Sequence, residues 1–211
     1  MAANKIALPV IRRLPKYYRY LKELQLGGTK NISSSELAHL MGTTASQVRQ
    51  DFSCFGGFGQ QGIGYDISTL LDKLEQLLYH EEKLNAILIG VGSLGQAIAK
   101  WLVRDVQGYR LLAAFDTNEA LIGKTVCNTP ILSTESLRAF CAEHHPQVAV
   151  LCLPQEPARL LAPVLIDCGI RGYLNFSHYD LSVGHPELTV ENVHLGDSMM
   201  SLGYRVRENQ E

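Results

Sequence analysis

The sequence lacks the features that mark several special classes of protein. No apolar run approaches the roughly 18 to 20 residues that a membrane-spanning helix needs, and the first residues lack the apolar core of a signal peptide. The five cysteines are scattered, with no C-x-x-C pair, and internal repeats are missing. We therefore expect a cytoplasmic protein with buried thiols and neither a membrane nor a metal as partner. A redox-reactive cysteine is the alternative interpretation of the thiols.

The charge is low overall but unevenly distributed. The net charge is −2, yet residues 1–50 carry eight Lys or Arg against Glu23 and Glu36, a net of +6 that leaves −8 for the rest. A basic N-terminal segment followed by an acidic remainder indicates a polyanionic partner at one end of the protein only. The alternative is a solvated, charged helix face.

One stretch, Asn85–Asp116, organises the second half of the chain. The apolar run Ala86–Ile89 is typical of a strand buried on both faces, and apolar residues recur at helical spacing in Gln96–Arg104. A second apolar run, Leu111–Phe115, ends in Asp116, which lies 24 residues after Gly92. Between the first strand and the helix lies a G-x-G-x-x-G turn made of Gly90, Val91, Gly92, Ser93, Leu94 and Gly95. This order of elements predicts a dinucleotide site.

Each part of this stretch has a physical role. Gly90 permits the tight turn, Gly92 lets the backbone approach a pyrophosphate, and Gly95 lets the helix pack closely on the strand. The N–H groups at the helix start hold phosphates. Asp116 would accept hydrogen bonds from the adenosine ribose and repel a 2′-phosphate, which favours NAD(H) over NADP(H). A glycine turn needed only for helix–sheet packing is the alternative.

The first half of the chain has the pattern of a helix-turn-helix. Apolar periodicity predicts helices over Pro9–Leu26, Ser35–Met41 and Ala45–Phe55, with Pro15 near a first turn of the longest one. The third helix exposes side chains that can bond base edges or phosphates, namely Ser46, Gln47, Arg49 and Gln50. Gly56–Tyr65 predicts a β-hairpin, the wing of a winged helix, and a second phosphate loop is its rival interpretation. Asp66–Tyr79 predicts a connecting helix.

After Asp116 the alternation of strand and helix continues, which predicts an α/β doubly wound sheet. Ligands of such sheets lie beyond the carboxyl ends of the strands, where Pro154, Asn175 and Phe176 fall. Ordinary loop chemistry is an equal alternative for these three residues. The short apolar helix Gly196–Tyr204 should pack on something, and a second subunit is one candidate.

Taken together, the two halves resemble the redox-sensing transcriptional repressor Rex family. The resemblance covers nearly the whole chain and rests on RLPKYYRYL (13–21), SSSELAHLMGTTASQVRQDFSCFGGFGQQGIGY (33–65), ILIGVGSLG (87–95), AAFD (113–116), GIRGYLNF (169–176) and VENV (190–193). It implies a repressor, not an enzyme, that binds operator DNA and is released by NADH. The implied architecture is a homodimer with a winged-helix domain (1–80), a Rossmann domain (81–193) and a C-terminal helix (194–211) swapped into the partner subunit.

The resemblance also implies roles for particular residues. Arg49 and Gln50 would enter the major groove, Arg13 would contact phosphates, the wing around Gln60 would lie near the minor groove, and Trp101 would lie by the nicotinamide. The full set of expected DNA contacts is Arg12, Arg13, Lys16, Ser34, Thr44, Ser46, Gln47, Arg49, Gln50, Phe58, Gln60, Gln61 and Tyr65. The expected NAD(H) contacts are the six residues of the glycine turn with Trp101, Asp116, Pro154, Asn175, Phe176 and His194.

The chain departs from the family pattern at two places. Gln50, Gln60 and Gln61 stand where many members have basic residues, so we expect fewer neutralised phosphates and a shallower salt dependence of DNA binding. After VENV many members carry an Asp that pairs with an arginine of the first helix, for which Arg19 is the match here. This chain has His194 instead, with Asp197 three residues on, and either residue is a candidate for that role.

Two other functions are compatible with parts of the sequence. An NAD-dependent dehydrogenase would need an acid–base residue, and His178, His185 and His194 are candidates outside any recognisable catalytic motif. A nucleotide domain like those of CoA ligases is suggested by LPQEP and GIRGYLNF. Asp116 speaks against it, because CoA lacks a free ribose diol at the adenosine.

Overall fold

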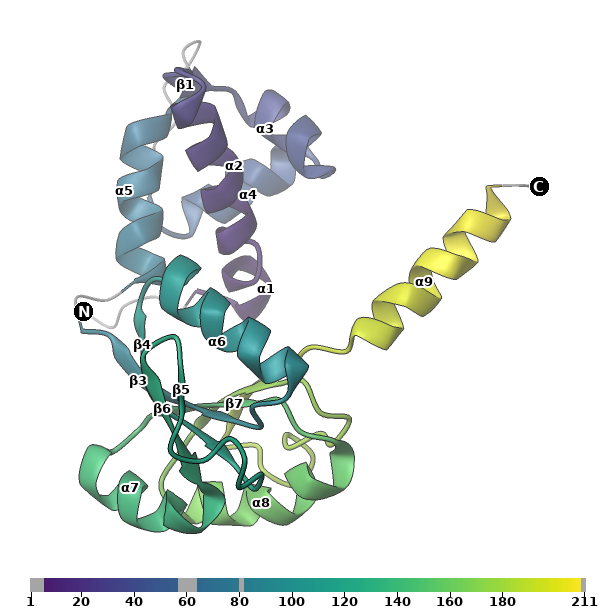
Figure 1. Cartoon of the computed structure of the whole chain (residues 1–211). Helices are drawn as coiled ribbons and strands as arrows, with labels where there is room; N and C mark the ends of the chain where they lie inside the picture. Colours follow the sequence, from purple (N-terminus) through teal and green to yellow (C-terminus); the bar gives the residue numbers. More distant parts are fainter. Residues whose placement is uncertain (1–5, 57–63, 80–81, 210–211) are drawn as a thin grey trace. The chain divides into compact units, whose positions relative to one another are not determined.

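The computed structural model describes residues 6–56, 64–79 and 82–209, and the chain forms two compact units, Met1–Glu81 and Glu82–Glu211. Figure 1 shows the helical N-terminal unit and the sheet of the C-terminal unit. No helix in the described ranges is long and apolar enough to cross a membrane. Each unit is described by itself.

The long helix expected at the start of the chain is divided in two. Helix α1 (Leu8–Ile11) ends before α2 (Leu14–Leu26) begins, and Pro15 occupies the first turn of α2. A proline at this position has no N–H to bond the preceding turn and clashes with the carbonyl four residues back, so the helix restarts there. Leu14, Tyr17 and Leu21 point into the core of the unit.

The next two helices have the capping that the sequence predicts. Ser33 Oγ accepts a hydrogen bond from Glu36 N, and Glu36 Oε2 accepts one from Ser33 N, which completes a capping box before α3 (Ser34–Met41). Gly42, at φ +65°, ends α3 in the left-handed conformation. Thr44 caps α4 (Ala45–Ser53), which ends two residues earlier than expected. The compact turn holds α3 and α4 as a helix-turn-helix.

A two-stranded sheet and one more helix complete the N-terminal unit. Strand β1 (Asn31–Ile32) pairs antiparallel with β2 (Tyr65–Asp66), and Asp66 caps α5 (Ile67–Leu78) through a bond from Thr69 N. The expected wing tip, with Phe58, Gln60 and Gln61, lies outside the described residues. The aromatic core joins Tyr17, Phe52 and Tyr65, with ring centroids 4.9 and 5.0 Å from that of Phe52.

The C-terminal unit is built on a seven-stranded sheet in the order β5-β6-β4-β3-β7-β8-β9. All neighbours are parallel except β5 and β6, which form a hairpin. The strands are β3 (Leu84–Ile89), β4 (Tyr109–Asp116), β5 (Thr125–Val126), β6 (Thr129–Ser133), β7 (Val148–Leu151), β8 (Gly172–Asn175) and β9 (Thr189–Asn192). The strand order reverses between β3 and β7, the position at which doubly wound sheets bind ligands.

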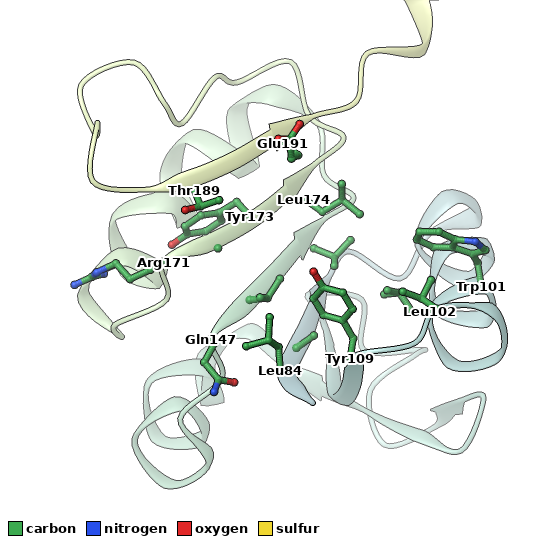
Figure 2. Close-up of a pocket in the computed structure, with 15 residues that line it drawn as sticks. Leu84, Trp101, Leu102, Tyr109, Gln147, Arg171, Tyr173, Leu174, Thr189 and Glu191 are labelled. Atoms are coloured by element: carbon green, nitrogen blue, oxygen red, sulfur yellow. The ribbon is translucent and has the colours of Figure 1, made fainter. Parts of the chain in front are cut away.

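The helices cover the two faces of the sheet unequally, as Figure 1 shows. Helices α7 (Leu137–His144, after the 3-10 turn Thr134–Ser136) and α8 (Gln155–Asp167) bury one face. On the other face α6 (Ser93–Asp105) covers β3 and β4, while β7 to β9 carry no helix within the described part of the unit. An apolar cavity of about 510 Å³ lies there, lined by side chains from α6 and from the strands (Figure 2).

The last helix, α9 (Leu195–Glu208), is longer than the predicted one and has no buried residue. Its large apolar side chains are all exposed, among them Leu195, Met199, Leu202 and Val206. These four recur at i, i+4, i+7 and i+11, which places them on one side of the helix. An amphipathic helix without a buried face in its own chain is unusual for a monomer.

Candidate functional site

The glycine turn has the geometry that a bound pyrophosphate needs. Gly90 has φ +91°, and a Cβ there would lie 2.5 Å from the carbonyl oxygen of Cys152. A Cβ at Gly95 would overlap the carbonyl oxygen of Gly90, so α6 packs directly on the strand end. Gly92, the N-cap of α6, has nothing within 4 Å of its Cβ position. The three glycines therefore serve a turn, a close contact and an open approach, as the sequence predicts.

Asp116 lies beside this turn at the end of β4. Its Oδ2 accepts a hydrogen bond from Val91 N at 2.6 Å, and its Oδ1 accepts one from Asn118 N at 2.9 Å. These bonds leave further lone pairs on both oxygens, because a carboxylate has about four acceptor sites. The carboxylate is therefore fixed in orientation and still able to accept two ribose hydroxyls.

A cavity of about 490 Å³ lies in front of the turn and Asp116. Gly90 and Gly92 form its floor, and Pro154 at the end of β7 forms part of its wall. The remaining lining side chains are mostly apolar and come from β3, β4, the segment that follows β7, and α8, with Thr117 and Thr134: Ile89, Phe115, Cys152, Leu153, Pro157, Leu160 and Leu161. A polar turn opposite an apolar wall suits a nucleotide, which has a charged pyrophosphate and a flat base.

The cysteine in this cavity is not set up as a reactive thiol. Burial raises the pKa of Cys152 to about 12. Burial, and to a lesser extent the neighbouring Cys168, raises the pKa of Cys141 to about 12. Because the thiolate is the nucleophile, a raised pKa lowers the reactivity of both thiols at neutral pH. The interpretation of these two cysteines as buried structural thiols is consistent with this chemistry.

The other expected cofactor residues lie in different places. Asn175 is fully buried; its Nδ2 donates to Tyr179 O and Asn192 Oδ1, and its Oδ1 accepts from Ser177. Its side chain therefore holds the loop after β8. Phe176 packs against the core on the α6 side of the sheet. Trp101, 45% exposed, lines the apolar cavity of Figure 2 and not the cavity at the glycine turn.

In the N-terminal unit, α3 and α4 present a polar face. Arg49 Nη1 donates to Ser34 Oγ at 3.0 Å, which joins the start of α3 to the middle of α4. Ser46 and Gln50 are exposed on the same helix as Arg49. Arg12, Lys16 and Thr44 are exposed too, and Tyr65 is buried in the core. The exposed groups are hydrogen-bond donors and acceptors of the kind that read DNA.

Arg13 is engaged inside the unit. Its Nε and Nη2 each lie 2.7 Å from an oxygen of Asp51, which is fully buried in α4. Tyr17 Oη and Gln47 Nε2 also donate to that carboxylate, at 2.8 and 2.9 Å. Burial alone would raise the pKa of Asp51, but the bonds from Arg13, Tyr17 and Gln47 outweigh it and lower the pKa. Arg13 keeps three N–H bonds for another acceptor, because the guanidinium has five.

The comparisons with known proteins cover both units. Residues 5–53 match the family model described as putative DNA-binding protein N-terminus, and residues 81–179 match the CoA binding domain model. A redox-sensing transcriptional repressor Rex from Thermoanaerobacter pseudethanolicus is 42% identical over 98% of this chain and 92% of its own length. The protein of that name from Clostridium botulinum strain Eklund 17B is 42% identical over the full length of both. The chain belongs to the Rex family.

Solved structures agree with this membership. The crystal structure of RSP in complex with β-NAD+ and operator DNA superposes with a TM-score of 0.88, at 40% identity over 98% of this chain and 95% of RSP. RSP in complex with β-NADH superposes with a TM-score of 0.87, at 38% identity over 97% and 96% of the two chains. The fold is that of a Rex repressor, an N-terminal DNA-binding domain followed by a Rossmann-like domain. The described residues of this chain contain no group of three or more potential metal ligands.

Some residues that shape the sites were not singled out from the sequence. Asp51 is one, although its position three residues after Val48 already placed it on the buried side of α4. The α8 residues Pro157, Leu160 and Leu161 are others, and only the sheet topology brings them beside the glycine turn. The stacking of His178 on His194 had no signal in the sequence, because sixteen residues separate them.

Proposed function

We propose that this chain is a redox-responsive transcriptional repressor, whose N-terminal unit binds operator DNA and whose Rossmann unit binds NAD(H). NADH releases the DNA, so transcription follows the ratio of NADH to NAD+ in the cytoplasm. The observation that carries the proposal is the full-length likeness to RSP, which is known both with operator DNA and β-NAD+ and with β-NADH. The open Gly92 and the oriented Asp116 support the same ligand in this chain.

The residues at the glycine turn fit a dinucleotide. The backbone N–H groups at the start of α6, with the positive end of its dipole, would hold the pyrophosphate. Asp116 would accept the adenosine ribose hydroxyls, and Pro154 would lie along the ligand as it crosses from β3 to β7. The bound cofactor supplies the redox state as a signal, because its nicotinamide carries a positive charge only in the oxidised form. No catalysis is required of the protein.

The DNA contacts that we propose lie on α3 and α4. Arg49 and Gln50 would read base edges in the major groove, with Ser34, Thr44 and Ser46 on the flanking phosphates. Arg13 would contribute its remaining N–H groups to a phosphate, and Arg12 and Lys16 add positive charge. Gln47 supports this face through its bond to Asp51.

Release by NADH requires a difference in binding free energy between two conformations. NAD+ and NADH share nearly every contact, so the charge and shape of the nicotinamide must favour different arrangements of the DNA-binding units. We expect NADH to bind more tightly than NAD+ and to favour the arrangement that does not fit the operator.

The test is fluorescence anisotropy of a short labelled palindromic duplex carrying a Rex operator, at one fixed salt concentration. We expect NADH to release the protein and NAD+ to leave it bound. Release by neither nucleotide, or by both equally, would contradict redox sensing. Turnover of an alcohol, aldehyde or hydroxy acid with NAD+, checked on the same sample, would favour the dehydrogenase hypothesis instead.

We also propose that the protein is a homodimer held by α9. The apolar side of α9 is uncovered, and the cavity beside α6 is apolar, with Leu84, Trp101, Tyr109 and Leu174 on its walls (Figure 2). Both surfaces would be covered if each α9 packed against the sheet of a second copy. Such an exchange of one helix between two copies forms a two-fold symmetric dimer at a low cost in free energy.

Met199→Glu is expected to weaken the dimer at least about 100-fold, because it places an unpaired carboxylate in an apolar contact. Light scattering after size exclusion would measure the mass over a range of protein concentrations. Ser201→Glu is the matched control, since Ser201 lies on the polar side of α9 with Asp197 and Arg205. A Met199→Glu protein that stays dimeric at nanomolar concentration would show that α9 does not hold the subunits together.

A further inference from the structure

One buried carboxylate joins helix α2 to helix α4 in the N-terminal unit. Asp51 is fully buried, and each of its two oxygens accepts two hydrogen bonds. Oδ1 accepts from Arg13 Nη2 at 2.7 Å and from Gln47 Nε2 at 2.9 Å. Oδ2 accepts from Arg13 Nε at 2.7 Å and from Tyr17 Oη at 2.8 Å. All four acceptor sites of the carboxylate are therefore occupied, which fixes its orientation and that of the Arg13 guanidinium.

The contact between Arg13 and Asp51 uses only one edge of the guanidinium. Nε and Nη2 face the carboxylate side-on, so the outer edge keeps two parallel N–H groups, one on Nη1 and one on Nη2. The Arg13 side chain is 32% exposed, and no acceptor for this outer edge lies among the described residues. Two parallel N–H groups match the spacing of two oxygens of a phosphate. Arg13 is therefore held in an orientation that leaves a phosphate-binding edge available.

The position of Arg13 in its helix also favours an anion. Arg13 is the N-cap of α2, and the start of a helix carries partial positive charge. A cation at this position is unfavourable by itself, and the Asp51 carboxylate offsets the repulsion from inside the unit. A DNA phosphate would offset it from outside. The start of α2 thus combines an oriented cation with a helix dipole that attracts the same anion.

We infer that Asp51 is a positioning residue for operator binding, which aims the outer edge of Arg13 at a DNA phosphate and ties this contact to α4, the helix that would read the bases. This inference rests on the proposed DNA-binding function. Without the carboxylate, the long Arg13 side chain would occupy several rotamers in the free protein and lose that freedom on binding DNA. Gln47 strengthens the tie within α4, because a carboxylate only accepts and so turns the amide nitrogen of Gln47 towards Asp51.

The direction of the expected effect separates positioning from overall charge. Asp51 is an acid in a unit that would bind a polyanion, so removal of its charge should strengthen DNA binding if electrostatic attraction alone decided the affinity. We expect the opposite result for Asp51→Asn. Both oxygens of Asp51 accept from Arg13, so the amide group of the variant places an N–H donor against a donor of Arg13 in either orientation. The guanidinium then turns away, and operator affinity should fall about 5- to 10-fold for each bound subunit.

The experiment measures the anisotropy of the labelled operator duplex with the full-length protein over a series of salt concentrations. The slope of log affinity against log salt should become shallower by about 0.9 for each bound subunit in Asp51→Asn and in Arg13→Met, because each variant loses one phosphate contact. Arg13→Met should cost little further affinity when it is added to Asp51→Asn. Glu36→Gln is the matched control, since it removes the same charge from the exposed start of α3, keeps the capping box and should not weaken binding.

The outcomes separate three cases. Amide hydrogen exchange in α2 and α4 shows which variants are folded, and a folded Asp51→Asn protein with unchanged affinity and slope would overturn the inference. If Asp51→Asn does not fold, Tyr17→Phe keeps every charge, removes one bond to Oδ2 and should weaken binding about threefold. Unchanged affinity of Tyr17→Phe would then overturn the inference as well. An unmodified protein that does not bind the operator overturns the proposed function instead.

Discussion

Arg13→Met is expected to lower the free energy of unfolding of the N-terminal unit by about 3 kcal/mol, because it leaves the buried Asp51 carboxylate without its cation. Two donors, Tyr17 and Gln47, would remain, so the loss is at the lower end of what an uncompensated buried charge costs. Amide hydrogen exchange in α2 and α4, followed against urea, would measure the stability of this unit separately from that of the Rossmann unit.

The controls separate the ion pair from a general loss of charge. Arg19→Met removes an exposed arginine of the same helix and should change stability by no more than about 0.5 kcal/mol. In a double-mutant cycle, Arg13→Met and Asp51→Asn together should cost less than the sum of the two single variants. Purely additive effects would show that the two side chains do not stabilise each other.

The difference in stability between the unmodified protein and Arg13→Met depends on pH, in the direction that the lowered pKa of Asp51 sets. The folded protein holds the pKa of Asp51 below its usual value, so the stabilisation is complete above about pH 4, the unfolded value for Asp. It is lost as the pH falls through the lower, folded pKa. The difference in stability between the unmodified protein and Arg13→Met should therefore shrink below about pH 4.

Local signals in the sequence were sufficient for most of the fold. The capping box of Ser33 and Glu36, the stop at Gly42 and the G-x-G-x-x-G turn each act within a few residues, so the helices and strands that they bound were predictable. The residues at which helices and strands end were less predictable. The predicted helix over Gly196–Tyr204 extends to Glu208, because Val206 continues the apolar side of the helix among the charged residues that follow Tyr204.

The parts of the sites that depend on long-range contacts were not predictable. Arg13 was expected to face a phosphate, and no local pattern shows that two of its N–H groups bond a carboxylate 38 residues away. Asn175 was expected beside the cofactor, and its buried amide holds the neighbouring loop. In both cases the tertiary fold selects the partner, so residue type and spacing alone leave it open.

Asp116→Ala is expected to raise the dissociation constant for NADH about 10- to 100-fold. The variant removes a charged acceptor of the ribose hydroxyls, and a net contribution of about 1.5–3 kcal/mol for a hydrogen bond to a charged group corresponds to roughly this factor. It also removes the repulsion of a 2′-phosphate, so the discrimination against NADPH should fall. Calorimetry with NADH and NADPH would measure both, and Glu119→Ala, an exposed carboxylate three residues on, is the control.

The same variant decides between the dinucleotide and CoA for this Rossmann unit, since residues 81–179 match a model named for CoA binding. The adenosine ribose of CoA carries a phosphate where NADH has a free hydroxyl, so Asp116 should repel CoA and attract NADH. If CoA is the ligand, Asp116→Ala should tighten CoA binding and leave NADH unbound in both proteins. If NADH is the ligand, the unmodified protein should bind NADH and not CoA, and a variant with unchanged NADH affinity would show that Asp116 only orders the turn through Val91 N.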